Sequence, residues 1–398
     1  MKGKVLLFSL LIQPFFSNFL QAQNAWNCLL HLPGAKDISF QLEKLPGKQG
    51  FRLINGSEIL TLDSLLAEGD SIVLPVSVFD VALKLPANQG SDFQGSYWNW
   101  DARPSGYQLS FSAKAIHQVH LPSKKQAALE AEEFVIRFLK NGIAADSGIL
   151  RIQKDGIIVQ GTILHKKGDY RFLHGEFKGE KLVLSTFDGG HAFYFELDFS
   201  QKRSVFSGMF LSGRRHSQPI DGYRLKSAPN VGSAFRDTEG RISFSGRLPF
   251  NKLITQDAPE YRGNALVVQL LGTWCPNCLD ETRFLSEEYP NRPSGVEFVG
   301  LAFEQRKGDS SYAFSRIDVV RNKLKVPYTI AWAGAASKDS ALKAIPALGK
   351  MEAFPTTIFV RKDGSIHKIH SGFSGPATGP YFLAWRKEFE ELLQEISR

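Results

Sequence analysis

Hydrophobic and polar residues alternate along the first part of the chain in the short runs typical of antiparallel sheet. These runs extend from about residue 26 to residue 224, and residues 107–111 alternate cleanly. Residues 51–62 form two runs around Asn55-Gly56, a pair that readily takes the positive φ angles of a tight hairpin turn. Turn glycines then recur at Gly156, Gly161, Gly168, Gly175 and Gly179. The pattern predicts an all-β sandwich or barrel.

After about residue 229 the pattern changes to strands and helices in alternation. The run 265–271 is almost wholly apolar, as expected of a parallel strand that is covered on both faces. The apolar spacing predicts further strands at 296–302 and 328–332, a hairpin of 356–360 with 366–369, and helices at 275–289, 312–325, 339–348 and 382–396. Elements in this order predict a three-layer α/β domain.

The first residues differ from both parts. Lys2 and Lys4 precede a mostly apolar run over 5–20, which the small residue Ala22 follows closely. This order is typical of a secretory signal cleaved after Ala22, and the run is shorter than the ~20 apolar residues that span a bilayer. We therefore expect a periplasmic, exported protein. Its predicted parts are a signal peptide at 1–22, a β-rich domain at 23–226 and an α/β domain at 227–398.

Composition and charge narrow the classes of function. The chain has 398 residues, 43% of them hydrophobic and 22% charged, as in an ordinary soluble protein of more than one domain. The net charge of +8 is spread over 48 basic and 40 acidic residues rather than concentrated. Because nucleic-acid binding usually needs a continuous basic face, we expect no nucleic acid among the partners. A positive net charge leaves contact with an anionic membrane surface open.

The cysteines provide the strongest chemical signal. The chain has three: Cys28, and the pair Cys275 and Cys278 in Gly272-Thr-Trp-Cys-Pro-Asn-Cys278. Two thiols one turn apart, where a buried strand meets a helix, predict a dithiol that cycles with its disulfide. Cys275 is the predicted nucleophile, because the dipole and free N–H groups of a helix start stabilise a thiolate. Cys278 would resolve the mixed disulfide, and Pro276 suits the first helical position. Cys28 is assigned no role, since lone cysteines are most often buried.

The segment from about residue 229 to residue 398 resembles a thioredoxin-fold domain of the TlpA/ResA type. The resemblance is carried by Gly272–Cys278 after an apolar strand and by Phe354-Pro355-Thr-Thr-Ile358 after two further βα units. It implies that Trp274 packs beside the active site and that Pro355 is a cis-proline facing the thiols. It also implies that Glu281 transfers protons and sets the cysteine pKa. The residues alone offer a second interpretation of Glu281, as an acidic side chain that favours a helix start.

The activity implied by the resemblance is thiol-disulfide exchange without a cofactor. The dithiol would reduce disulfides of exported proteins, with oxidation as the weaker alternative, and an upstream thiol reductant would restore it. The segments Gly161–Leu164, Gly168–Leu173 and Leu184–Phe193 are similar to β-rich extensions of exported relatives, and they are candidates to hold a substrate or partner. The aromatic clusters at 97–100 and 191–195 are expected to be core, because rings on alternating strand positions mostly pack inward.

Three other functions share some of these features. A zinc site would add His367 and His370 to the two thiols, but residues three apart on a strand point to opposite faces. A thioredoxin-fold peroxidase, as that family is known, has a threonine three residues before its reactive cysteine, whereas Thr273 is two residues before Cys275. A non-catalytic binding protein acting through its β domain would tolerate loss of either thiol, and both are present.

Overall fold

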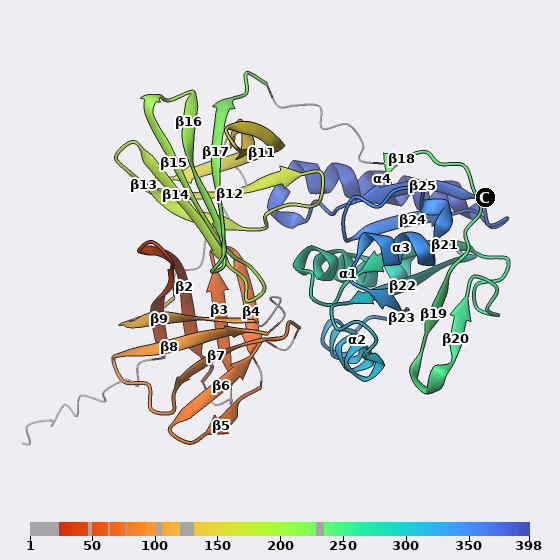
Figure 1. Cartoon of the computed structure of the whole chain (residues 1–398), viewed down its shortest axis with the longest axis horizontal. Coiled ribbons are helices and arrows are strands. Elements are labelled where there is room, and N and C mark those ends of the chain that lie inside the picture. Colours follow the sequence, from red (N-terminus) through yellow and green to blue (C-terminus); the bar gives the residue numbers. More distant parts are fainter. Residues whose placement is uncertain are drawn as a thin grey trace, which may run out of the picture.

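Three β-sheets organise the chain in the computed structural model (Figure 1). The structure describes residues 24–46, 50–62, 64–76, 78–100, 106–119, 131–227 and 235–398. The predicted signal peptide and its cleavage after Ala22 lie outside the described residues. Within the described part of the chain, no helix is both long and apolar enough to cross a membrane.

The first sheet is open and antiparallel. Its strands are β1 (Ala25–Leu32), β2 (Lys36–Lys44), β3 (Phe51–Asn55), β4 (Glu58–Leu62), β5 (Leu66–Glu68), β6 (Ser71–Pro75), β7 (Val81–Pro86), β8 (Asp92–Asn99) and β9 (Tyr107–Ile116). They lie in the order β4-β3-β2-β1-β9-β8-β7-β6-β5. The predicted hairpin joins β3 to β4, with Gly56 at a φ of 56°. Cys28 is fully buried in this sheet, and burial raises the pKa of its thiol.

The second sheet closes into a barrel. Its strands are β10 (Ala131–Lys140), β11 (Ile143–Asp155), β12 (Ile158–His165), β13 (Leu173–Lys178), β14 (Lys181–Phe187), β15 (Ala192–Lys202), β16 (Val205–Ser212) and β17 (His216–Arg224). Each strand pairs with the next, and β17 returns to β10. Buried rings such as Phe134, Phe195 and Phe206 fill the interior, as in other barrels of eight strands. The predicted all-β fold is therefore confirmed, but its strands divide into two sheets, because alternation does not say which strands pair.

The third sheet belongs to the α/β domain. Its elements are β18 (Phe235–Arg236), β19 (Ser245–Arg247), β20 (Leu253–Thr255), β21 (Ala265–Leu271), α1 (Pro276–Glu288), β22 (Val296–Glu304), α2 (Ser310–Leu324), β23 (Thr329–Ala335), α3 (Lys338–Ala344), β24 (Thr356–Val360), β25 (Ile366–Ser371) and α4 (Pro380–Ser397). Strands β21, β22 and β23 pair in parallel, whereas β24 pairs antiparallel with both β21 and β25. Each predicted element of this domain is present.

Two differences from the predicted elements have local causes. The helix predicted at 339–348 ends at Ala344, because Pro346 disfavours a helical conformation for the residue before it. The strands β18, β19 and β20 contain two or three residues each, too few for a period to be visible in the sequence. The layers follow from alternation along β21. Val267 packs with α1, α2 and α4 on one face, and Val268 with α3 on the other.

Both β units pack against the α/β domain, and so they lie on one side of it in Figure 1. One buried hydrophobic cluster contains Phe79 between β6 and β7, Phe187 of the barrel and Leu279 of α1. A polar contact joins the barrel to α4, where the Tyr381 hydroxyl donates to Glu133 Oε2 at 3.0 Å. These contacts bring the end of the barrel to the first turn of α1.

Candidate active site

The two thiols lie where β21 ends and α1 begins. Cys275 is the N-cap of α1, and its Sγ accepts a hydrogen bond from the Cys278 N–H at 3.3 Å, with Pro276 as the first helical residue. The Cys275 thiol points toward the Phe354 carbonyl oxygen at 3.7 Å. Both cysteines are free thiols. The N–H contact is of the kind that stabilises a thiolate, so the geometry suits Cys275 as a nucleophile.

The two sulfurs differ in access and in electrostatics. Cys275 keeps 8% of its surface exposed, whereas Cys278 has none. Burial raises the pKa of the Cys278 thiol well above its ordinary value, and its hydrogen bond with Cys275 and the charge of Glu281 act in the same direction. Cys278 therefore holds its proton in the resting site. A substrate sulfur can reach Cys275 first.

Glu281 lies one turn further along α1 and is fully buried. Its carboxylate accepts hydrogen bonds from Thr357 Oγ1 at 2.8 Å and from Gln269 Nε2 at 2.9 Å. Burial raises the pKa of Glu281 to about 7, although the two hydrogen bonds oppose the shift. A carboxyl group with this pKa can give or take a proton near neutral pH. Its burial distinguishes it from an exposed acidic side chain that only favours a helix start.

Gln269 holds Glu281 in place, a role that the sequence alone did not predict. Its side chain also donates to the Cys278 carbonyl at 3.3 Å and accepts from the hydroxyls of Thr282 at 3.1 Å and Tyr328 at 3.3 Å. The available signal was its position, because it is the single polar residue in the apolar run 265–271. A polar group in a strand covered on both faces needs partners, and here those partners include Glu281.

Trp274 and the Phe354-Pro355 loop flank Cys275. The Trp274 Nε1–H donates to the Phe303 carbonyl at 2.9 Å, and its ring meets Phe354 edge-on with 6.0 Å between centroids. The Phe354-Pro355 peptide bond is cis, as the resemblance implied. The carbonyl of this bond is the one that the Cys275 thiol contacts. The structure therefore places Trp274 and the loop at Pro355 beside the Cys275 sulfur.

The histidines considered for a zinc site have other partners. His367 Nε2 pairs with Glu395 at 2.6 Å, and His370 Nε2 accepts from Trp385 Nε1 at 3.1 Å. Among the residues that the structure describes, no three or more His, Cys, Asp or Glu side chains are arranged to hold a metal ion.

The barrel approaches the first turn of α1 closely. Asn277 Nδ2 donates to the Asp169 carbonyl at 2.9 Å. Gly168, at a φ of +122°, faces the same side chain, and a Cβ added there would lie 2.4 Å from Asn277 Nδ2. A Cβ on Gly190 would lie 2.8 Å from Pro276 Cγ. Both contacts are closer than ordinary Cβ contacts, so glycine allows the barrel backbone to reach the residues beside Cys275.

A buried ion cluster joins the three sheets at this point. Arg171 pairs with Glu58 of the open sheet, Asp188 of the barrel and Asp280 of α1. Its Nη1 also donates to the Pro276 carbonyl at 3.4 Å. Burial alone would lower the pKa of Arg171, but the carboxylates, Asp280 foremost, raise it well above its ordinary value. A charged guanidinium therefore ties the start of α1 to both β units.

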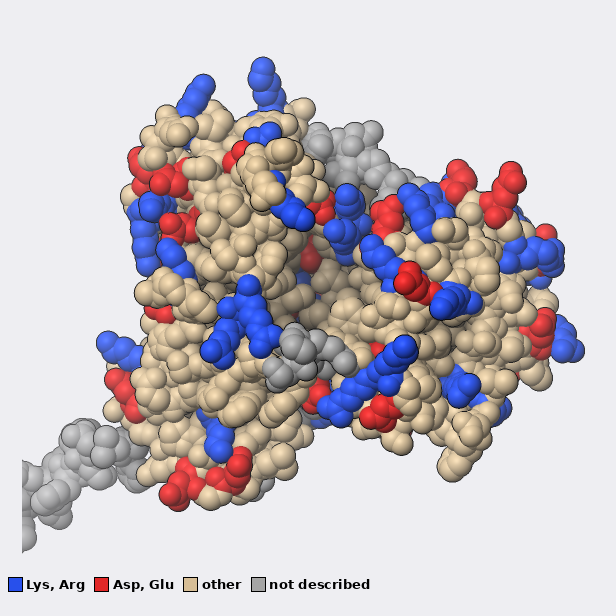
Figure 2. Space-filling model, viewed as in Figure 1, with Lys and Arg blue, Asp and Glu red and all other residues tan. Residues whose placement is uncertain are grey.

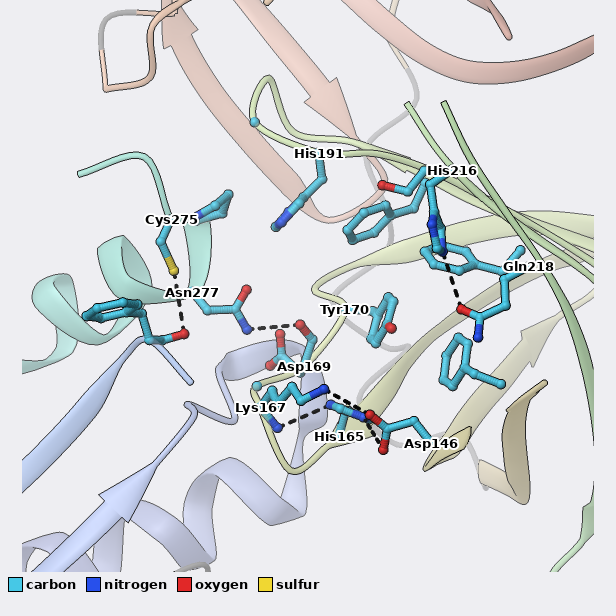
Figure 3. A pocket seen from close by; sticks show the side chains of 18 of the residues that line it. Asp146, His165, Lys167, Asp169, Tyr170, His191, His216, Gln218, Cys275 and Asn277 are labelled. Carbon is cyan, nitrogen blue, oxygen red and sulfur yellow. Dashed lines mark hydrogen bonds and ion pairs between the residues drawn. The ribbon is translucent and has the colours of Figure 1, made fainter. Parts of the chain in front are cut away.

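A cleft of about 740 Å³ separates Cys275 from the end of the barrel. The α/β wall consists of Trp274, Cys275, Pro276, Asn277 and Phe354. The barrel wall includes the rings of Phe138, Tyr170, Phe193 and Phe210 together with His165, His191 and His216. Figure 3 shows Cys275 on one side of the cleft and Tyr170, His216 and Gln218 on the other. In Figure 2 the surface is hollowed between the barrel and the α/β domain, and acidic and basic side chains are interspersed over this face.

The cleft corrects part of the sequence analysis. The aromatic cluster at 191–195 was expected to be core, which holds for Phe195, but His191 and Phe193 line the cleft. In the cluster at 97–100, Tyr97 is buried and Trp100 is 49% exposed. These rings lie at strand ends, where alternation no longer separates an inside from an outside. The segments 168–173 and 184–193, considered as a place for a substrate or partner, supply Tyr170, His191 and Phe193 to the cleft.

Comparison with known proteins places a family match over the α/β domain. Residues 230–379 match the family model described as Redoxin, and this part of the chain has a thioredoxin-like fold. No curated protein matches the chain.

Solved structures that are similar to part of the chain include three thiol-disulfide proteins. A thiol:disulfide interchange protein from Chlorobium tepidum has 16% identity and a TM-score of 0.29, covering 41% of this chain and 99% of its own. A thiol-disulfide oxidoreductase from Bacteroides fragilis has 16% identity and a TM-score of 0.28, covering 38% and 99%. A secreted thiol-disulfide isomerase from Corynebacterium glutamicum has 14% identity and a TM-score of 0.30, covering 43% and 98%.

Proposed function

We propose that this protein is an exported thiol-disulfide oxidoreductase of the TlpA/ResA type that reduces disulfides through Cys275 and Cys278. The observation that carries the proposal is the arrangement of the two sulfurs. Cys275 keeps 8% of its surface exposed at a helix N-cap, where its Sγ accepts the Cys278 N–H at 3.3 Å, and Cys278 is a fully buried thiol one turn away. The match of residues 230–379 to the Redoxin model supports the same class of activity.

The reaction proceeds in two exchanges. In the first, the Cys275 thiolate attacks one sulfur of a substrate disulfide. A bond forms between that sulfur and Cys275 while the substrate S–S bond breaks, and the leaving thiolate takes up a proton. In the second, Cys278 loses its proton and attacks the Cys275 sulfur, which releases the other substrate thiolate and leaves a Cys275–Cys278 disulfide. Two electrons pass to the substrate, and an upstream dithiol reductant restores the pair by the reverse exchanges.

Glu281 is the group that takes the Cys278 proton in this scheme. Its carboxyl group is buried, interacts electrostatically with Cys278 and has a pKa of about 7, raised by burial. A buried acceptor is needed, because the Cys278 thiol has no exposed surface from which water could remove its proton. Gln269 and Thr357 hold the carboxylate in place.

The peroxidase alternative has less support at the same helix start. The Thr273 hydroxyl donates to Glu304 Oε2 at 2.8 Å, and the Thr273 N–H donates to Glu304 Oε1 at 3.0 Å. Glu304 is fully buried, so this hydroxyl is committed to a structural pair.

The proposed substrates are exported proteins with disulfides. We propose that the protein itself is exported, because a secretory signal is predicted at 1–22. The proposed boundary between the β-rich part and the α/β domain, at 226/227, lies between β17 and β18.

Activity and redox potential test this proposal separately. The reduced protein should reduce hydroxyethyl disulfide with loss of both thiols of the pair, and failure to do so would exclude the activity. Equilibration with glutathione then gives the potential of the pair. A value of about −270 mV supports a reductant, whereas one of about −120 mV would make the protein an oxidant.

A further inference from the structure

We propose that the open end of the barrel is the substrate-binding half of this site. It selects disulfides carried on extended peptide segments in which an aromatic side chain lies next to the half-cystine. We call this surface the barrel mouth, formed by Phe138, Tyr170, Phe193, Phe210, His216 and Gln218. The inference rests on the proposed exchange activity, because the sulfur that the barrel mouth faces is that of Cys275.

The shape of the cleft limits what can reach the sulfur. A volume of about 740 Å³ is that of a site for a short peptide or a small molecule. The barrel backbone meets the first turn of α1 at Gly168 and Gly190, so one side of Cys275 is closed by the barrel itself. A disulfide must therefore enter along the barrel mouth. An extended chain can do this, whereas a folded domain would collide with the barrel.

The barrel mouth is an aromatic surface with unfilled space in front of it. Tyr170 stacks on Phe138 with 5.8 Å between centroids and an interplanar angle of 12°. Phe193 contacts Tyr170 at 5.3 Å and Phe210 at 5.5 Å. Tyr170 and Phe193 are only partly buried, unlike the rings deeper in the barrel. A ring that enters the cleft extends this aromatic stack, and it does so beside Cys275.

Three basic groups of the cleft are already paired with acidic side chains of the protein. Lys167 is the only lysine or arginine among the described residues that line the cleft, and its Nζ pairs with Asp146 at 3.0 Å. His165 Nε2 pairs with the same carboxylate at 3.1 Å, and His191 Nδ1 pairs with Asp188 at 3.1 Å. An anionic small disulfide such as oxidised glutathione would have to compete for these groups. An uncharged aromatic side chain would not.

The test compares matched disulfides with the full reduced protein. Kinetics are measured with a peptide disulfide that has Phe beside the half-cystine, the same peptide with Gly there, oxidised glutathione, and hydroxyethyl disulfide. We expect kcat/KM for the Phe peptide to exceed that for the Gly peptide by about tenfold. Phe193→Ala should bring this ratio close to one, and it should lower kcat/KM for the Phe peptide more than it changes hydroxyethyl disulfide reduction.

A matched control comes from the same barrel. Phe177 is a partly buried ring that packs on Phe199 at 6.0 Å and lines a different cavity, so Phe177→Ala should keep the peptide preference. If Phe193→Ala does not fold, Ser212→Trp provides the second variant, because it fills the cleft without removing a core ring. It should slow both peptides more than it slows hydroxyethyl disulfide.

The outcomes distinguish failure of the barrel mouth as a recognition surface from failure of the proposed exchange activity. Equal rates for the Phe and Gly peptides, a preference that survives Phe193→Ala, or peptide rates that Ser212→Trp leaves unchanged would overturn the barrel mouth as the recognition surface while leaving the exchange activity intact. A higher kcat/KM for oxidised glutathione than for the Phe peptide would also overturn it, in favour of a small anionic substrate. Failure to reduce hydroxyethyl disulfide would instead remove the proposed function itself.

Discussion

The two walls of the cleft are built in opposite ways. The α/β wall comes from two short stretches, residues 274–277 and the loop at Phe354, which hold the reacting sulfur at a helix start. The barrel wall collects side chains from six strands and from the loops between them. One wall is a local motif and the other is a product of topology. The chemistry of exchange lies on the first, and in our account the selection of substrates lies on the second.

The sharpest way to break this division is to remove the sulfurs from the α/β wall. Cys275→Ser should lower disulfide reduction by at least about 10³-fold, because it removes the nucleophile. Cys278→Ser should stop turnover and accumulate a mixed disulfide at Cys275, which mass spectrometry would detect. Cys28→Ser is the matched control, since that thiol is buried in the open sheet, and it should leave the rate unchanged. Normal turnover in Cys275→Ser would place the chemistry elsewhere.

The difference between the walls also explains what the sequence could predict. The order of strands and helices in the α/β domain follows from local periodicity, and the Cys275–Cys278 spacing identified the thiols directly. Gln269 was visible as a polar residue in an apolar strand, but its partners Glu281 and Thr357 come from different elements. Sequence separation hides such contacts, because nothing in a run of residues says what will pack against it.

The barrel wall could not be assembled from sequence for the same reason. The segments 168–173 and 184–193 were noticed, yet their relation to Cys275 depends on the closure of an eight-stranded barrel and on its docking against α1. Period-two alternation assigns a ring to the inside of a strand pair. It does not distinguish a ring at the centre of a barrel from one at its end, which is the difference between Phe195 and Phe193.

A second prediction concerns the link between the walls. Arg171→Met removes the buried cation that Glu58, Asp188 and Asp280 share, and leaves those carboxylates without it. We expect a loss of about 3–5 kcal/mol in the free energy of unfolding, measured with urea. Arg137→Met is the control, because its ion pair with Asp221 is 43% exposed on the arginine side and should cost about 0.2–1 kcal/mol. Similar losses in the two variants would show that the cluster does not hold the walls together.

A third prediction concerns the titration of the buried Glu281 carboxyl group and its effect on the Cys275 thiol. The pKa of Glu281 is about 7 in the folded protein and 4.5 ordinarily, so folding binds its proton more tightly. The stability from this group is fully present below pH 4.5 and is lost as the pH rises toward 7, a change of about 3 kcal/mol. Glu281→Gln should remove this decline in urea unfolding. It should also alter the pH profile of Cys275 alkylation near pH 7.

The control for this prediction lies on the same helix. Glu287 is exposed on α1, so Glu287→Gln should leave both pH profiles as they are in the unaltered protein. If Glu281→Gln keeps the decline in stability and the alkylation profile, Glu281 has no titration in this range and does not take the Cys278 proton.

The smallest predicted effect concerns one hydrogen bond between the barrel and the first turn of α1. Asn277→Ala removes the bond from Asn277 Nδ2 to the Asp169 carbonyl, which should cost about 1 kcal/mol. Because this bond fixes the barrel against α1, the preference for the Phe peptide should fall about twofold, and hydroxyethyl disulfide reduction should change less than this preference. A larger change in hydroxyethyl disulfide reduction than in the peptide preference would assign Asn277 to the chemistry instead.

The assignment of Cys275 as nucleophile and Cys278 as resolving thiol is tested most directly by the relative reactivity of the two sulfurs in the reduced, unaltered protein. Brief iodoacetamide treatment near pH 7, followed by fragmentation mass spectrometry of the peptide that holds both cysteines, measures each site within one molecule. We predict that Cys275 is alkylated at least about tenfold faster than Cys278, because Cys275 keeps 8% of its surface exposed and accepts a helix N–H, whereas burial keeps Cys278 protonated. Equal alkylation of the two sulfurs, or faster alkylation of Cys278, would contradict the assignment of nucleophile and resolving thiol.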